Sequence, residues 1–191
     1  MAVANLDLKG FDRFRITIKD ALQPVAELIA DMPAQTPANR RRSISPVALQ
    51  AVSALTILLR EVYRLRAAAY AITESGDMEC IHYSGRGGRP RPFLKDTDRG
   101  RRALDFVARG GEPLFVPDVD KADNEDYKGS KSGYKTFISA SIHTADWGYG
   151  MLTIDAPRAG TLVDTDKQLV GLVGNLLAIA FAIAEWEKIG A

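Results

Sequence analysis

The chain has 191 residues, of which 46% are hydrophobic and 26% are charged, and its formal net charge is +1. This composition is typical of a globular protein, and the near-neutral charge gives no reason to expect nucleic acid or a membrane as a partner. Cys80 is the only cysteine, which excludes an internal disulfide and a cysteine-built zinc site. No signal-peptide pattern follows Met1, so we expect a cytoplasmic protein.

The first part of the chain predicts a helix followed by a linker. Between residues 10 and 32, apolar side chains recur at alternating steps of three and four residues, as in an amphipathic or coiled-coil helix. The members of this stripe are Phe11, Phe14, Ile18, Ala21, Val25, Leu28 and Met32. Pro24 is expected to kink or divide the helix, and "PAQTPANRRRS" at 33–43 indicates a polar linker. We assign residues 1–43 to a helical extension and linker, and residues 44–191 to the main domain.

The remaining chain predicts an α+β fold. A helix is expected from Ser45-Pro46, a hydroxyl cap followed by a proline in the first turn. The later elements are strands at 64–73 and 78–85, a helix at 97–111, a short strand before Asp118, a two-stranded hairpin within 134–158, and a helix from Thr165 to about Lys188. This order fits a central antiparallel sheet with helices on both sides.

The last helix is apolar on nearly all sides. "LVGLVGNLLAIAFAIA" at 169–184 is short for a membrane span and contains Asn175, so we interpret it as a buried or dimer-forming helix. Leu169, Leu172, Leu176 and Ile183 cover one side, and Val170, Leu177, Phe181 and Ala184 cover others. One side can pack on the sheet while another pairs with a second copy. We therefore expect a homodimer that Leu177→Glu or Phe181→Glu would dissociate, and the 10–32 stripe is a second candidate surface.

The first strand of the hairpin has two different faces, because strand side chains alternate with period two. Thr136, Ile138, Ala140 and Ile142 form the more apolar face, whereas Phe137, Ser139, Ser141 and His143 form the other. Small hydroxyls beside a ring and an imidazole indicate the wall of a polar, partly enclosed cavity. An ordinary half-exposed strand is the alternative.

Five segments, in this order and spacing, carry a family resemblance: "LRAAAYAITESGDMECI", "GRRALDFVARGGEPLFVPDV", "GYKTFISASI", "GMLTIDAP" and "DTDKQLVGLVGNLLAIAFA". Together they make residues 45–187 resemble a GAF domain, a small-molecule sensor module related to PAS. The resemblance implies that the first and last helices of the domain cover one face of the sheet. A short helix and a long loop would then close a ligand cavity over the other face.

On this resemblance we expect the ligand to contact Tyr83, Asp118, Tyr127, Tyr134, Phe137, Ser139, Ser141, His143, Thr153 and Asp155. Two of these roles have plain alternatives. Asp118 ends a strand at Pro-Asp and is equally suited to a turn. The two loop tyrosines offer a flat face with a polar tip to a planar ligand, but they are also common packing residues.

Other candidate sites are weaker. "GRGGRP" with Arg86, Arg89 and Arg91 could hold an oxyanion, but it lacks the lysine and hydroxyl of a P-loop, and we favour a solvated, mobile loop. His143 could be the single protein ligand of a metal or haem, but a neutral imidazole is the interpretation we adopt, and we predict no metal site. The serines near His143 do not resemble a nucleophile elbow, so we predict no catalytic residues.

The position of Cys80 argues against two GAF activities. GAF domains that bind linear tetrapyrroles covalently use a cysteine after the central loop, whereas Cys80 lies in the second strand. Free methionine sulfoxide reductases work through several redox cysteines, and one cannot complete that cycle. We therefore expect a non-catalytic sensory module that signals through its helices to a separate output protein, with an unknown ligand and no cofactor assigned. The alternatives are a GAF-fold enzyme with non-cysteine chemistry and a scaffold whose cavity is filled by side chains.

Overall fold

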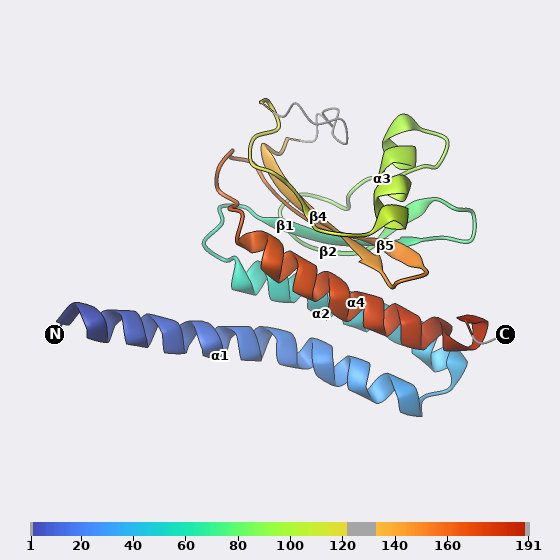
Figure 1. The fold of residues 1–191 in the computed structure, drawn as a ribbon, viewed down its shortest axis with the longest axis horizontal. Helices are drawn as coiled ribbons and strands as arrows, with labels where there is room; N and C mark the ends of the chain where they lie inside the picture. The colour runs from blue at the N-terminus through green and yellow to red at the C-terminus, as the bar shows by residue number, and fades with distance from the viewer. Residues whose placement is uncertain (1, 122–132, 190–191) are drawn as a thin grey trace.

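The computed structural model describes residues 2–121 and 133–189, with side chains described for 15–121 and 133–186. Its centre is a five-stranded antiparallel sheet with the strand order β2-β1-β5-β4-β3. The strands are β1 (Arg66–Ile72), β2 (Met78–Gly85), β3 (Leu114–Val116), β4 (Thr136–His143) and β5 (Gly148–Ala156). The helices are α1 (Ala2–Asp31), α2 (Pro37–Leu58), α3 (Asp98–Arg109) and α4 (Asp166–Ile189). Helices α2 and α4 cover one face of the sheet, and α3 stands on the other (Figure 1).

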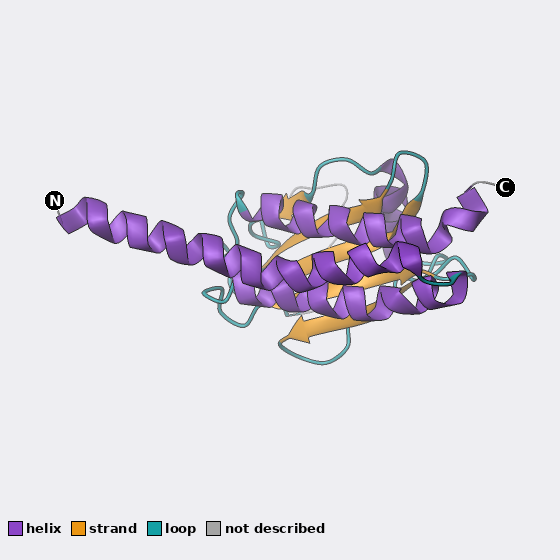
Figure 2. Cartoon of the chain, turned by 90° about the horizontal axis from the view of Figure 1, so that it is seen from below, coloured by secondary structure: helices purple, strands orange, loops and turns teal. Residues whose placement is uncertain are grey.

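The expected α+β architecture is confirmed, including the first and last helices of the main domain on one face of the sheet. Helix α1 lies outside α2 and α4, and its N-terminal part extends beyond the rest of the molecule (Figure 2). The hairpin strands and α3 also lie where the sequence pattern put them. Helix α3 begins after Thr97, whose hydroxyl accepts a hydrogen bond from the Gly100 N–H at 3.0 Å, and it ends at Gly110.

Helix α1 continues through Pro24 and is not divided there. The linker expected at 33–43 is wrong for its second half, because residues 37–43 form the first turns of α2. That helix begins after Thr36, whose hydroxyl accepts a hydrogen bond from the Asn39 N–H at 3.4 Å, and Pro37 is its first residue. The hydroxyl-plus-proline signal at Ser45-Pro46 therefore has an equivalent nine residues earlier, and the helix continues through Pro46.

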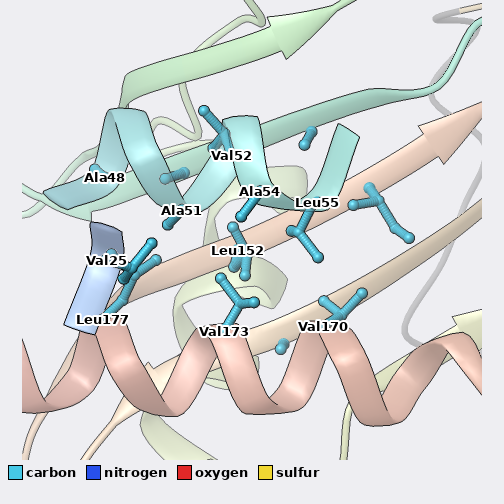
Figure 3. Packing of buried hydrophobic residues seen from close by; sticks show 14 of the residues in the cluster. Val25, Ala48, Ala51, Val52, Ala54, Leu55, Leu152, Val170, Val173 and Leu177 are labelled. Carbon is cyan, nitrogen blue, oxygen red and sulfur yellow. The ribbon is translucent and has the colours of Figure 1, made fainter. Parts of the chain in front are cut away.

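The main core lies between the sheet and its two covering helices (Figure 3). Leu55 of α2, Leu152 of β5 and Leu177 of α4 have no exposed surface, and Val25 of α1 packs into the same cluster. Other fully buried members include Val47, Val52, Ile138, Ile142, Ile154, Val170 and Val173. This confirms that the Ile138 side of β4 faces the helices.

The same packing overturns the dimer variants expected from the sequence. Leu177 is fully buried, and Phe181 stacks on Tyr149 with ring centroids 5.5 Å apart. A glutamate at either position would disrupt the fold rather than a contact between copies. Within the described residues, one helix segment, Asp166–Trp186, is long and apolar enough to cross a membrane, although Leu177 and Val173 of this segment lie in the core.

We expect Ile138→Asp to unfold the protein. Ile138 is fully buried between β4 and the helices, and a carboxylate placed there has no partner, so the cost is about 3–5 kcal/mol. Ile57→Asp is the matched control, because Ile57 of α2 is 49% exposed. Urea denaturation followed by circular dichroism compares the two. Equal stability of the two variants would show that Ile138 is not a core residue.

Candidate functional site

The face of the sheet that carries α3 is lined by small and polar side chains. Strand register pairs Ser139 with Thr153 and Thr153 with Ala68, and it pairs Asp155 with both Phe137 and Arg66. We call this surface the polar face. It consists of Arg66, Ala68, Tyr83, Phe137, Ser139, Ser141, Thr153 and Asp155. Six of the ten expected ligand residues therefore lie on one surface contributed by four strands.

Thr153 lies at the centre of the polar face. It belongs to β5, the middle strand of the sheet, yet its side chain is only half-buried, whereas its neighbours Ala68 and Ser139 are buried. An antiparallel sheet can pack one face on the core and leave the other partly open. The half-buried Thr153 shows that the polar face is not completely covered at the middle of the sheet.

Asp155 is the acidic residue of the polar face. Arg66 donates hydrogen bonds from Nε and Nη2 to Asp155 Oδ2 at 2.9 and 2.8 Å, and Arg86 donates from Nη2 to Oδ1. Burial raises the pKa of Asp155, and the two guanidiniums oppose that rise. The interpretation of a solvated arginine loop is therefore wrong for Arg86, whose side chain packs against the sheet. The preceding Gly85 has a φ of 96°, and a Cβ there would lie 2.1 Å from the Leu65 carbonyl oxygen.

His143 lies at the end of β4 and contacts the C-terminal end of α3. Its Nε2 accepts a hydrogen bond from the Gly111 N–H at 3.4 Å, and its Nδ1 lies 2.9 Å from Ser141 Oγ. These two contacts link the end of β4 to the residues that follow α3.

Of the expected ligand residues not yet described, Tyr83 belongs to the polar face, whereas Asp118 and Tyr134 are not part of it. Asp118 Oδ1 accepts a hydrogen bond from the Asp120 N–H at 3.0 Å, the geometry of a turn aspartate. Tyr134 packs edge-to-face on Phe137 with centroids 5.7 Å apart. Tyr83 is half-buried on β2, opposite Ala68. Tyr127 lies outside the described residues.

A second apolar cluster lies on the α3 side of the sheet near the β2 edge. Tyr70 packs edge-to-face on Phe93 at 5.0 Å, and Met78 and Val107 are buried with it. Burial raises the pKa of Cys80, in the same cluster, to about 11. Its thiol is therefore protonated at neutral pH and poorly suited to nucleophilic or redox chemistry.

The structure adds arginines that the sequence did not single out. Arg66 belongs to β1 and Arg99 to α3, where the Arg99 guanidinium lies 3.6 Å from the Phe93 ring centroid. The signal for Arg66 was available, because period-two alternation puts it on the same face as Ala68 and Tyr70. The described residues contain no group of three or more histidine, cysteine or acidic side chains that could hold a metal ion. A surface hollow lined by Arg102, Asp105, Ala108 and Arg109 lies on α3 and not on the polar face.

Comparison with known proteins identifies one family. A family model for the GAF domain matches residues 49–181. No curated protein matches the chain.

Solved structures of similar fold include three informative ones. The free methionine-R-sulfoxide reductase of Neisseria meningitidis, in complex with its substrate, has a TM-score of 0.59 at 13% identity, covering 85% of this chain and 89% of that chain. The GAF domain region of a putative membrane protein from Geobacter sulfurreducens has a TM-score of 0.55 at 22% identity, covering 76% and 97%. The phycoerythrobilin-bound GAF domain of a cyanobacterial phytochrome has a TM-score of 0.57 at 17% identity, covering 85% and 96%. At these identities the likeness concerns the fold.

We expect Gly110→Ala to destabilise the protein by roughly 1–3 kcal/mol. Gly110 has a φ of 61°, and a Cβ there would lie 2.2 Å from His143 Nε2. Gly111→Ala is the control, because its φ is also positive but no atom lies within 4 Å of the added Cβ. Thermal unfolding should show a larger loss of stability for Gly110→Ala than for Gly111→Ala. When each is combined with His143→Ala, the difference in stability between the two glycine variants should become smaller. If the histidine substitution leaves the difference unchanged, the ring is not packed against Gly110.

Proposed function

Because the chain belongs to the GAF family, we propose that it is a sensory module that binds a small molecule on the polar face, beneath α3. The observation that carries this proposal is the half-buried Thr153 in the middle of the sheet, surrounded by Ala68 and Ser139. The opposite face of the same strands is packed against α2 and α4. Of the two faces of these strands, the polar face is therefore the one that offers polar groups to a ligand.

Two of the similar structures support a small-molecule site by analogy. One is described in complex with its substrate and the other with bound phycoerythrobilin. The analogy does not extend to the chemistry of either protein. Cys80, the only cysteine, is buried and its pKa is raised to about 11, so thiol redox catalysis and covalent attachment through a reactive thiolate are both disfavoured. Binding without catalysis is the function that these residues favour.

We further propose that the module is a cytoplasmic homodimer that signals through its helices to a separate output protein. On α4, apolar residues recur at steps of three and four, the spacing of a coiled-coil seam. They are Leu169, Leu172, Leu176, Ile179, Ile183 and Trp186. Leu172 is 46% exposed, Ile179 is 49% exposed and Trp186 is 64% exposed. A second copy that covers this seam would remove a continuous apolar strip from water.

The ligand proposal is tested by native mass spectrometry of freshly purified protein. We expect a bound molecule in the natural protein and its loss in Thr153→Met, because the longer side chain fills the space above β5. Thr165→Met is the control, since Thr165 is exposed in the segment before α4. A spectrum of the natural protein that shows only the mass of the polypeptide would argue for a scaffold with a filled polar face.

The dimer proposal is tested by sedimentation velocity. Leu172→Glu combined with Ile179→Glu should convert the dimer to a monomer with little loss of stability, because both side chains are about half-exposed. Leu94→Glu, at a 46% exposed residue just before α3 on the other side of the sheet, should leave the dimer intact. A natural protein that sediments as a monomer at micromolar concentration would refute the proposal.

A further inference from the structure

We propose that the ligand of the polar face carries an oxyanion, a carboxylate or a phosphate, which Arg66 and Arg86 bind. This inference rests on the proposed function, because it assumes that the polar face is a ligand site, and it adds the chemical class of the ligand.

Among the residues that the structure describes, the positive charges at this site exceed the negative ones. Arg66 and Arg86 share one carboxylate, that of Asp155, and the side chains are 14%, 13% and 8% exposed, respectively. The three groups therefore carry one net positive charge in a place that is largely shielded from water. A shielded charge is unfavourable without a counter-charge. An anionic ligand would supply it.

One donor of Arg86 has no acceptor. Its Nη2 donates to Asp155 Oδ1, but its Nε is buried and has no hydrogen-bond partner within the described part of the chain. Buried donors are almost always paired in native proteins. The Nε–H and one Nη–H of a guanidinium form a planar fork that matches the two oxygens of a carboxylate or phosphate. Arg86 Nε therefore has the chemistry to bind such a group.

The surroundings of the two arginines also favour an anion. Arg99 of α3 lies over the Phe93 ring, and Arg89 donates to the Cys80 carbonyl oxygen of the edge strand β2, so two further arginines lie on α3 and at this edge of the sheet. No acidic side chain other than Asp155 is paired with any of these four among the residues described. Thr153, two residues before Asp155 on the same face, provides a hydroxyl beside the cluster. The result is a positively charged site next to the half-buried Thr153.

Asp155 has a separate role in this arrangement. Both of its oxygens accept hydrogen bonds from the arginines, so it orients the two guanidiniums and neutralises only one of them. The competing explanation is that the three residues serve only to fasten the 85–93 loop to the sheet. In that case Arg86 would not respond to added anions.

The test follows the arginine Nε–H resonances of the 15N-labelled full chain by NMR. Sodium phosphate or sodium acetate replaces sodium chloride at constant ionic strength, and Arg86→Lys assigns the Arg86 resonance by its disappearance. We expect a saturable shift of the Arg86 resonance with one or both anions, and the stronger binder identifies the oxyanion. Arg86→Lys keeps the positive charge but lacks the planar pair of N–H donors. The affinity for the anion, measured from the shift of the Arg66 Nε–H resonance, should therefore fall about tenfold. Arg42→Met is the control, because Arg42 is exposed on α2, on the other side of the sheet, and should bind as the natural protein does.

The absence of a saturable shift of any arginine Nε–H resonance with either anion would overturn the inference, and this observation needs no assignment and no variant. Unchanged anion affinity in Arg86→Lys would overturn it as well. These failures are distinguishable from failure of the proposed function. If mass spectrometry finds a neutral molecule that Thr153→Met displaces while Arg86 does not respond to anions, the sensor function stands and the oxyanion is wrong.

Discussion

The burial of one face of the sheet beneath α2 and α4 is the interaction on which the rest of the structure depends. Leu152 and Ile154 of the central strand lie on that face without exposed surface. Because side chains alternate along a strand, fixing these residues against the helices also fixes Thr153 and Asp155 on the opposite face. The core thus determines which side chains face α3.

Because the core lies on one face of the sheet, the polar face can carry hydroxyl and charged side chains. Stability comes from the helix side, where the main cluster is made of aliphatic side chains from the sheet and three helices. The other side can then keep small hydroxyls and a group of arginines without weakening the core. Sites that bind ligands are commonly built in this way, with a stable scaffold that supports less favourable residues.

The hairpin was predictable because its information is local. Strand alternation put Phe137 and Ile138 on opposite faces of the sheet. The exact pairing, such as Ser139 with Thr153, also depends on a register shift beside His143 that the sequence pattern does not show. The start of α2 was not predictable in the same way. Thr36-Pro37 and Ser45-Pro46 are equivalent local signals. The packing of α2 against α1, α4 and the sheet determines which of the two signals starts the helix. These contacts are long-range, so a local sequence pattern does not reveal them.

The arginine cluster was the part of the site least visible in the sequence. Arg86 meets Asp155 across 69 residues of chain, and a glycine-rich loop with several arginines looks like a solvated segment when it is read alone. The role of Arg66 was not apparent for another reason, because this arginine is the first residue of an alanine-rich strand. In both cases a long-range pairing gives the residue its role, and composition cannot reveal such a pairing.

Helix α1 has a mechanical consequence. It has 30 residues, so it is about 45 Å long at the usual rise per residue, and only its C-terminal half contributes buried side chains to the core in the part whose side chains are described. The helix is therefore a lever whose pivot rests on α2 and α4. About half of this length, roughly 22 Å, lies beyond the pivot, so each degree of tilt would move the far end by about 0.4 Å. A small rearrangement of the two covering helices would therefore be enlarged at the N-terminus.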